Sequence, residues 1–218
     1  MRVVFAAGGT GGHINPALAA AGELRRRFPD ADILFIGTKD KMEAKLVPDA
    51  GFDFKTIEIS GFQRKLTPQN IKRNIITLKR LITSGSQVKK ILKEFKPDAV
   101  IGFGGYVSGP VVRTAAKMGI KTAIHEQNAF PGVTNRLAAR WATAVFVPYE
   151  EARAHFPPGV RLIRAGNPVR PEIASKAKDL LEKANGHILG VVLNRVEIEK
   201  KDAYYYYYYG SNDIKQRA

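Results

Sequence analysis

The 218-residue chain has no cysteine, no long apolar run and comparatively few acidic residues. Without cysteine there can be no disulfide, no thiolate nucleophile and no thiolate-based metal site. No apolar stretch approaches the roughly 20 residues that cross a bilayer. The four histidines lack metal-ligand spacing, so we expect neither a metal nor another cofactor. These absences favour a cytoplasmic location.

The scarcity of acids leaves a formal net charge of +15, from 35 Lys and Arg against 20 Asp and Glu. Such an excess indicates an anionic partner, which could be nucleic acid, a phospholipid surface or a phosphorylated ligand. Between Ser60 and Lys96 ten residues are basic and only Glu94 is acidic. No recognition motif or interleaved aromatic residues accompany this charge, so nucleic acid is not an expected partner.

The first 165 residues alternate short apolar runs with helical patterns, which predicts an α/β fold: a Rossmann-like, doubly wound parallel sheet. The expected strands are Arg2–Ala7, Asp32–Gly37, Asp53–Ile59, Ala99–Phe103, Thr122–His125, Ala144–Val147 and Arg161–Arg164. The expected helices are Asn15–Phe28, Lys41–Val47, Ile71–Phe95, Val107–Met118, Val133–Trp141 and Glu150–His155. Ligands of such sheets bind beyond the carboxyl ends of the strands.

A glycine-rich loop, Gly8–Gly12, lies between the first expected strand and helix. Its glycines let a backbone approach a ligand, and the helix start that follows suits phosphate. It is neither a dinucleotide fingerprint nor a P-loop, because the small residue and the Gly-Lys-Ser/Thr triplet that these motifs require are absent. A tight turn without a ligand is the alternative. His13, just beyond, could be a general base, a hydrogen-bond donor or simply a helix-start residue.

Two further polar or glycine-rich segments follow expected strands. The segment from Gly102 to Pro110 contains Tyr106, for which an ordinary half-buried aromatic is the plain alternative. The second segment begins His125-Glu126-Gln127-Asn128. Glu126 could act as a general base, orient a hydroxyl, or belong to a satisfied polar cluster. Two glycine-rich loops of one sheet are expected to line a single crevice.

The ordered motifs GGTGGHINPALA, FIGTKDKMEAKLVP, ISGFQRK, PDAVIGFGGYVSGP, HEQNAFPGVTNRLAA and GNPVR resemble the N-terminal domain of the MurG family. The resemblance covers residues 1–173 and implies one half of a GT-B glycosyltransferase. Members are inverting enzymes without a metal requirement. They transfer N-acetylglucosamine from its UDP-sugar to lipid I (undecaprenyl-pyrophosphoryl-MurNAc-pentapeptide), forming lipid II for peptidoglycan.

The resemblance also implies roles for individual residues. Catalytic candidates are His13, Glu126 and Tyr106, with His13 the first choice for the base and Glu126 the second. Substrate-binding candidates are Thr10, Gly11, Gly12, Asn128, Asn135 and Arg170. The guanidinium of Arg170 would suit a diphosphate as a bidentate donor.

The basic segment fits a peripheral membrane protein on the inner face of the cell membrane. Apolar residues recur at helical spacing between Ile71 and Leu92 and are flanked by basic ones. The plain alternative is a core-packing helix with a solvated basic face. We expect an anionic membrane patch, because each Lys or Arg near such a surface contributes about 1 kcal/mol. Its members are Lys72, Arg73, Ile75, Leu78, Lys79, Arg80 and Ile82.

The resemblance stops at about Ile173, where a MurG-like enzyme would continue into a donor-binding domain. Residues 174–209 instead resemble the C-terminal tail of bacterial capsular tyrosine autokinases, ending in six tyrosines, Tyr204–Tyr209. Kinase nucleotide-binding motifs are absent, so kinase activity is not expected. The alternative for the tyrosines is low-complexity sequence without a function. The expected domains are therefore residues 1–173 and a partly disordered tail, 174–218.

Two functions follow from this organisation. The first is the acceptor half of a lipid I N-acetylglucosaminyltransferase, inactive in isolation because most contacts to the UDP-sugar are missing. The second is a non-catalytic membrane- and acceptor-binding subunit of a split glycosyltransferase, which recruits a separate donor-binding chain.

Overall fold

The computed structural model describes residues 1–61, 67–170 and 173–176, without the side chains of residues 68, 71–76, 78, 79, 81 and 82. By its internal contacts the chain divides into two units, Met1–Ser175 and Lys176–Ala218. The predicted tail, including the tyrosine run, falls almost entirely outside the described residues. The domain boundary after residue 173 therefore stays a prediction.

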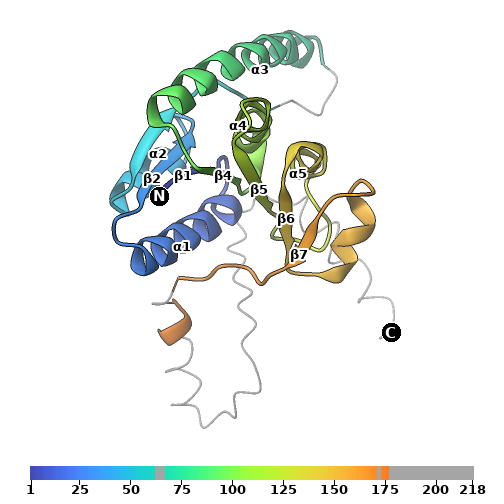
Figure 1. Cartoon of the computed structure of the whole chain (residues 1–218). Coiled ribbons are helices and arrows are strands. Elements are labelled where there is room, and N and C mark those ends of the chain that lie inside the picture. Colours follow the sequence, from blue (N-terminus) through green and yellow to red (C-terminus); the bar gives the residue numbers. More distant parts are fainter. Residues whose placement is uncertain (62–66, 171–172, 177–218) are drawn as a thin grey trace, which may run out of the picture. The chain divides into compact units, whose positions relative to one another are not determined.

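A seven-stranded, fully parallel sheet forms the centre of the first unit (Figure 1), with strand order β3-β2-β1-β4-β5-β6-β7. Its strands are β1 (Arg2–Ala6), β2 (Asp32–Gly37), β3 (Asp53–Thr56), β4 (Ala99–Gly102), β5 (Lys121–His125), β6 (Ala144–Val147) and β7 (Leu162–Arg164). The helices are α1 (Gly11–Arg27), α2 (Glu43–Asp49), α3 (Pro68–Phe95), α4 (Gly105–Lys117), α5 (Val133–Ala138), and the 3₁₀ turns η1 (Ala139–Trp141) and η2 (Glu150–His155). The predicted doubly wound α/β fold is confirmed.

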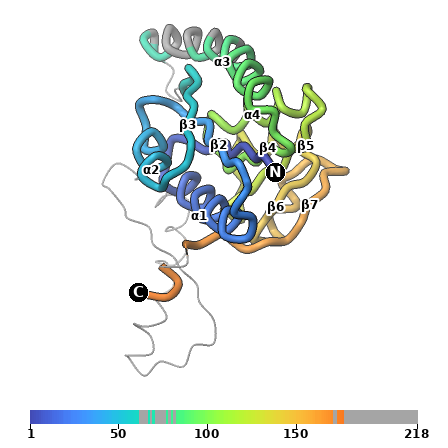
Figure 2. Tube along the Cα trace, turned by 60° about the vertical axis from the view of Figure 1, so that its left-hand side comes forward, coloured from blue at the N-terminus to red at the C-terminus, as the bar shows by residue number. Residues whose placement is uncertain are grey.

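Helices cover both faces of this sheet, which explains why its strands are apolar throughout rather than alternating. In β1, Val3 and Phe5 belong to the apolar cluster shared with α1 and α2. Val4 and Ala6 point the other way, into the cluster that contains residues of α3 and α4. Figures 1 and 2 accordingly show α1 on the opposite side of the sheet from α3 and α4.

Several predicted boundaries differ from the observed ones, and three of these differences have a clear local reason. The third strand ends at Thr56 instead of Ile59, because its only neighbour, β2, ends at Gly37. The first helix begins at Gly11, since the His13 and Ile14 amides already donate to the Thr10 carbonyl. The helix predicted over residues 133–141 changes from α-helix to 3₁₀ geometry after Ala138.

The strand order places the glycine-rich loops where ligands are expected. From β1 the chain first builds the sheet outward through β2 and β3, then crosses back to β4 on the other side of β1. The carboxyl ends of β1 and β4 therefore form the topological switch point of the sheet, where open α/β sheets bind their ligands. The Gly8–Gly12 loop follows β1, and the loop Phe103–Gly104 follows β4.

Candidate active site

The loops after β1 and β4 pack backbone to backbone. Gly105, at φ 73°, lies so close to the Gly8 carbonyl oxygen that a Cβ at position 105 would overlap it. Gly104 and Gly9 also have positive φ, 96° and 93° respectively. L side chains rarely adopt this conformation, so glycine is needed at these positions. The two loops are therefore in direct contact, while the expectation that they line one crevice stays a prediction.

His13 stands in the first turn of α1 and packs over the second loop. A Cβ on Gly104 would lie 2.7 Å from Cδ2 and 2.9 Å from Nε2 of the His13 ring. The ring Nδ1 hydrogen-bonds the Thr10 hydroxyl at 3.1 Å. Burial lowers the pKa of His13 below its ordinary value of 6.5, opposed by the charge of Glu126, the Gly8 backbone and the charge of Glu43. The imidazole is therefore neutral at pH 7 and able to accept a proton.

Two helix N-termini meet at this point without side-chain caps. Thr10 is the N-cap of α1 and Gly104 the N-cap of α4, and neither makes a side-chain capping hydrogen bond. Neither helix has an acidic residue in its first turn. Free amides and the positive ends of two helix dipoles favour an anion in front of them.

Glu126 is 1 % exposed and accepts five hydrogen bonds. Oε1 accepts from the backbone of Gln127 (2.9 Å) and from the backbone and side chain of Asn128 (2.9 and 3.0 Å). Oε2 accepts from the Gly132 amide (3.1 Å) and from Asn135 Nδ2 (2.8 Å). A carboxylate with this many donors organises the loop after β5. Accepting a proton from a substrate would require giving some of these bonds up.

Asn135 lies beneath the same glycine as His13. It is 2 % exposed, and its Nδ2 would lie 3.3 Å from a Cβ on Gly104. Within the described part of the chain its Oδ1 is buried without a hydrogen-bond partner. An unpaired buried acceptor is costly, so this oxygen calls for an explanation.

Tyr106, in the first turn of α4, packs on the other side of the first loop. Its Cε1 would lie 3.3 Å from a Cβ on Gly9. Burial raises the pKa of the Tyr106 phenol, and a hydrogen bond to Thr38 opposes the shift. The phenol therefore stays protonated at neutral pH, where it can donate a hydrogen bond but cannot act as a base.

Sequence reasoning assigned no individual role to three polar residues around these loops, two of which, His125 and Gln127, belong to the polar segment that it singled out. Glu43 is 1 % exposed and accepts a hydrogen bond from the Gly9 amide. His125 and Gln127 hold the segment after β7: His125 Nε2 lies 3.4 Å from the Gly166 carbonyl, and the Gln127 carbonyl accepts from Asn167 Nδ2 at 3.0 Å. Their position in the sequence could have drawn attention to them, because each lies at or after the carboxyl end of a strand beside β1 or β4.

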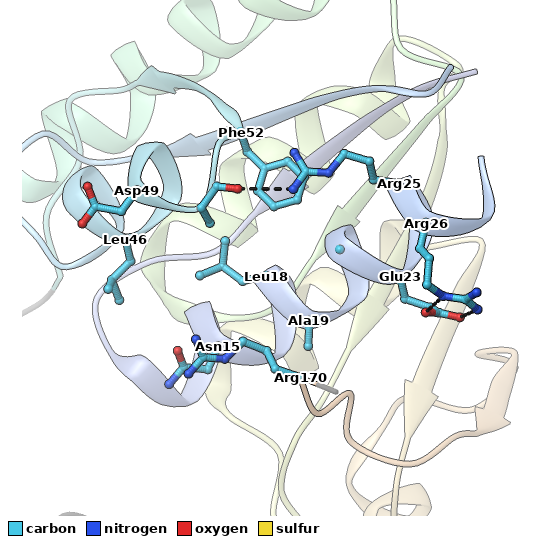
Figure 3. A pocket seen from close by; sticks show the side chains of 12 residues that line it. Asn15, Leu18, Ala19, Glu23, Arg25, Arg26, Leu46, Asp49, Phe52 and Arg170 are labelled. Atoms are coloured by element: carbon cyan, nitrogen blue, oxygen red, sulfur yellow. Dashed lines mark hydrogen bonds and ion pairs between the residues drawn. The ribbon is translucent and has the colours of Figure 1, made fainter. Parts of the chain in front are cut away.

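Arg170 lies beside α1. An open hollow of about 500 Å³ runs beside this helix, and Figure 3 shows Arg170 and Asn15 among the side chains that line it. The Asn15 side chain lies next to Gly11 of the first loop, since a Cβ on Gly11 would lie 3.4 Å from Asn15 Nδ2. Arg170 is thus near the first loop.

Of the predicted membrane patch, only Arg80 has a described side chain, which is exposed. Lys72, Arg73, Ile75, Leu78, Lys79 and Ile82 lie on α3 with their side chains outside the description. No helix of the described residues is both long and apolar enough to span a bilayer. Nor do three or more His, Asp or Glu side chains in that part converge as metal ligands.

Comparison with known proteins decides the family. The glycosyltransferase family 28 N-terminal domain matches residues 3–147. This chain belongs to that family. The predicted resemblance is confirmed, and the switch-point loops described above are therefore those of a family 28 N-terminal domain.

Relatives of this family 28 chain carry a more specific name. A Symbiobacterium thermophilum protein is 52 % identical over 186 residues, and a Bacillus subtilis protein is 47 % identical over 175 residues. Both are named UDP-N-acetylglucosamine–N-acetylmuramyl-(pentapeptide) pyrophosphoryl-undecaprenol N-acetylglucosamine transferase. The matches cover 85 and 80 % of this chain but only 49 and 47 % of the relatives. The chain thus spans about half the length of these relatives.

Solved structures agree on the fold. MurG of Acinetobacter baumannii aligns with a TM-score of 0.63 at 31 % identity, over 76 % of this chain and 46 % of that protein. A UDP-GlcNAc 2-epimerase from Neisseria meningitidis aligns with a TM-score of 0.55 at 16 % identity, over 85 % of this chain and 52 % of the epimerase. The second likeness concerns the fold alone.

Proposed function

We propose that residues 1–173 are the acceptor-side half of an inverting transferase that moves N-acetylglucosamine from UDP-N-acetylglucosamine to lipid I. The observation that carries this proposal is the junction of two uncapped helix N-termini with a neutral His13 in a family 28 domain. Relatives named for this transfer supply the substrates.

His13 is the proposed general base. It takes the proton from the attacking hydroxyl of the acceptor sugar as that oxygen bonds to C1 of N-acetylglucosamine, and the bond from C1 to the UDP oxygen breaks with inversion. The lowered pKa of His13 supports this role. Glu126 is proposed as the organiser of the loop after β5, because its oxygens are already occupied by five donors.

The remaining residues are proposed to bind the substrates. Free amides at Thr10, Gly11 and Gly12 suit a phosphoryl group. The unpaired Oδ1 of Asn135 can accept a hydrogen bond from a sugar hydroxyl. Asn128 and Arg170 would contact the UDP-sugar; most other contacts to it would come from a second domain, joined to this chain or supplied separately.

The same unit is proposed to lie on the anionic inner surface of the cell membrane, where its lipid-linked acceptor resides. Among residues 99–149, Glu126 is the single acidic residue against five basic ones. Val133 and Leu137 of α5, one helical turn apart, are 61 and 51 % exposed. Exposed apolar side chains among cations fit an interface with anionic headgroups.

A chimera tests the transfer. Residues 1–170 replace the matching half of the Bacillus subtilis relative, and transfer from UDP-N-acetylglucosamine to a lipid I analogue is measured. We expect turnover, and we expect His13→Gln in the chimera to lower kcat by about 10²–10⁴-fold. Glu58→Gln, on the exposed side of the sheet edge, is the control and should leave kcat unchanged.

Two outcomes would contradict the proposal. A chimera that folds and binds UDP-N-acetylglucosamine but transfers nothing would remove the assigned function. Full activity of the His13→Gln chimera would remove the base assignment alone. Adding the donor half as a separate chain distinguishes the split arrangement, because turnover would then require mixing both proteins.

A further inference from the structure

Glu43 is a buried carboxylate that the proposed reaction leaves without a role. It is the first residue of α2 and is 1 % exposed. No salt bridge to Glu43 occurs among the described residues. Burying a carboxylate without a cation is costly unless hydrogen bonds compensate, so its three donors matter.

Those donors come from two different strand ends. Oε1 accepts from the Thr38 amide (3.1 Å) and the Thr38 hydroxyl (2.8 Å), just after β2. Oε2 accepts from the Gly9 amide at 3.2 Å, in the loop after β1. Glu43 therefore ties the first glycine-rich loop to the neighbouring strand.

The surrounding glycines make room for this carboxylate. A Cβ on Gly8 would lie 2.9 Å from Glu43 Oε1, and a Cβ on Gly37 would lie 2.6 Å from Glu43 Cγ. Gly37 ends β2 and Gly8 lies in the loop after β1, so both positions beside Glu43 lack a side chain. The absence of these side chains lets the first loop approach Glu43 closely enough for the Gly9 amide to donate to its carboxylate.

Glu43 also acts electrostatically on the proposed chemistry. Its charge raises the pKa of His13 against the lowering by burial, and it raises the pKa of Tyr106. The other groups that influence His13 are the Glu126 charge and the Gly8 backbone. Glu43 therefore acts in two ways: it accepts a hydrogen bond from the Gly9 amide, and its charge affects His13 in the helix that follows the loop.

We propose that Glu43 is a positioning residue of the transfer site: it turns the Gly9 amide inward, leaving the amides of residues 10–12 for a phosphoryl group, and supplies negative charge behind His13. Glu43 does not touch substrate in this role. This role rests on the proposed function. The contact of Glu43 with Gly9 and the effect of its charge on His13 can nevertheless be measured on the chain without substrate.

The test is Glu43→Gln in the full chain, studied by NMR without substrate. The Gln carbonyl can still accept from Thr38, but its amide faces the Gly9 amide as a second donor. We expect hydrogen exchange at Gly9 to rise about tenfold, the loss of one ordinary hydrogen bond. We expect the pKa of His13 to fall below that of the unmodified chain, because the opposing charge is gone.

Two more variants separate the contributions. Glu43→Asp keeps the charge but shortens the reach, so Gly9 exchange should rise while the pKa of His13 falls less than in Glu43→Gln. Thr38→Val removes one donor to Glu43 and should raise Gly9 exchange even if Glu43→Gln does not fold. Glu58→Gln should change neither quantity.

Unchanged Gly9 exchange and an unchanged pKa of His13 in Glu43→Gln would overturn the proposal. In the chimeric transferase, Glu43→Gln should lower kcat more than it raises KM and move the acidic limb of the kcat/KM profile to lower pH. If the NMR changes appear but the chimera transfers nothing, the proposed function has failed while the positioning contacts stand.

Discussion

Individual glycines allow the loops after β1 and β4 to approach each other closely. Gly105 lies against the Gly8 carbonyl at φ 73°, and Gly104 makes room for the His13 ring. Both positions lie at or beside the N-cap of α4. A side chain there would therefore disturb the loops and the helix start together.

Gly105→Ala should destabilise the unit by about 2–4 kcal/mol, because it adds backbone strain to a direct overlap with Gly8. The matched control is Gly22→Ala inside α1, where a Cβ has nothing within 4 Å. That change should stabilise by about 0.5–1 kcal/mol through helix propensity. Urea unfolding monitored by circular dichroism measures both, and equal effects of the two substitutions would contradict the prediction.

Glu126 gives a second prediction at this scale. Glu126→Gln replaces one of the two acceptor oxygens by an NH₂ group, which is a donor. If it replaces Oε2, it faces the donors of Gly132 and Asn135. If it replaces Oε1, it faces those of Gln127 and Asn128. Leaving buried donors unpaired costs about 1–3 kcal/mol, so the free energy of unfolding should fall by that amount. Glu58→Gln on the surface should change it by less than about 0.5 kcal/mol. Unfolding free energies that agree for the two variants would show that the five hydrogen bonds are dispensable.

The sequence allowed His13 to be singled out but not Glu43. His13 follows a run of glycines directly, so local spacing marks it. Glu43 lies within the motif FIGTKDKMEAKLVP, but nothing local in that motif marks its carboxylate. Its contact with the first loop arises because β2 and β1 are neighbours. For Glu126, the sequence predicted its position after a strand. It could not predict the five hydrogen-bond donors, because these depend on how the loop from Gln127 to Asn135 folds back.

Among whole elements, strands and helices were predictable because their patterns are strong and local. Each predicted strand matches an observed one, with shifts of at most three residues at the ends. The largest shift, at the end of β3, arises because a strand needs a neighbour as well as a suitable sequence. Strand order is a tertiary property, so the position of the switch point between β1 and β4 could be expected only from the fold class.

Helix α5 and the turn after it carry a prediction about membranes. Val133 and Leu137 are exposed on α5, and Arg140 lies exposed in η1. Val133→Ser with Leu137→Ser should weaken binding to vesicles containing anionic phospholipid several-fold, by loss of buried apolar area. Arg140→Glu should weaken it by about tenfold or more, because each charge near the surface contributes about 1 kcal/mol. Vesicle co-sedimentation measures both.

The control for these variants lies on another helix. Phe28, the C-cap of α1, is 53 % exposed, and Phe28→Ser should leave vesicle binding unchanged. Added salt should reduce the binding of the unmodified chain, since the attraction is electrostatic. Binding that is indifferent to salt and to Arg140→Glu would exclude this face as the membrane contact.

At the scale of the whole molecule, the chain spans about half the length of its relatives. The helix N-termini, His13 and the Asn135 oxygen that has no partner among the described residues all belong to this half. A transfer reaction also needs groups that hold the departing nucleotide. The acceptor-side assignment therefore depends on experiments that supply a donor domain, as the chimera does.

The unit as a whole should lose stability as the pH falls below about 6.5, because one of its histidines, His125, is buried and another, His13, is partly buried. Burial lowers the pKa of both His13 and His125 from their ordinary value of 6.5. In the unfolded chain these imidazoles take up protons near pH 6.5, while in the folded chain they do so only at lower pH. The unfolded state then binds more protons, so unfolding becomes easier as pH decreases. Above pH 7 both states are neutral and the effect vanishes.

Urea unfolding at pH 7.5 and pH 5.5 measures this loss, to which each unit of pKa lowering contributes at most about 1.4 kcal/mol. His125 should contribute strongly, since it is 5 % exposed, stacks on Phe103 at 5.3 Å and accepts or donates only to Gln127 and Gly166 within the described residues. The variant His13→Gln with His125→Gln should lose less stability between the two pH values than the unmodified chain. If the double variant shows the same loss, the acid sensitivity arises from other groups, and neither imidazole is buried as a neutral base.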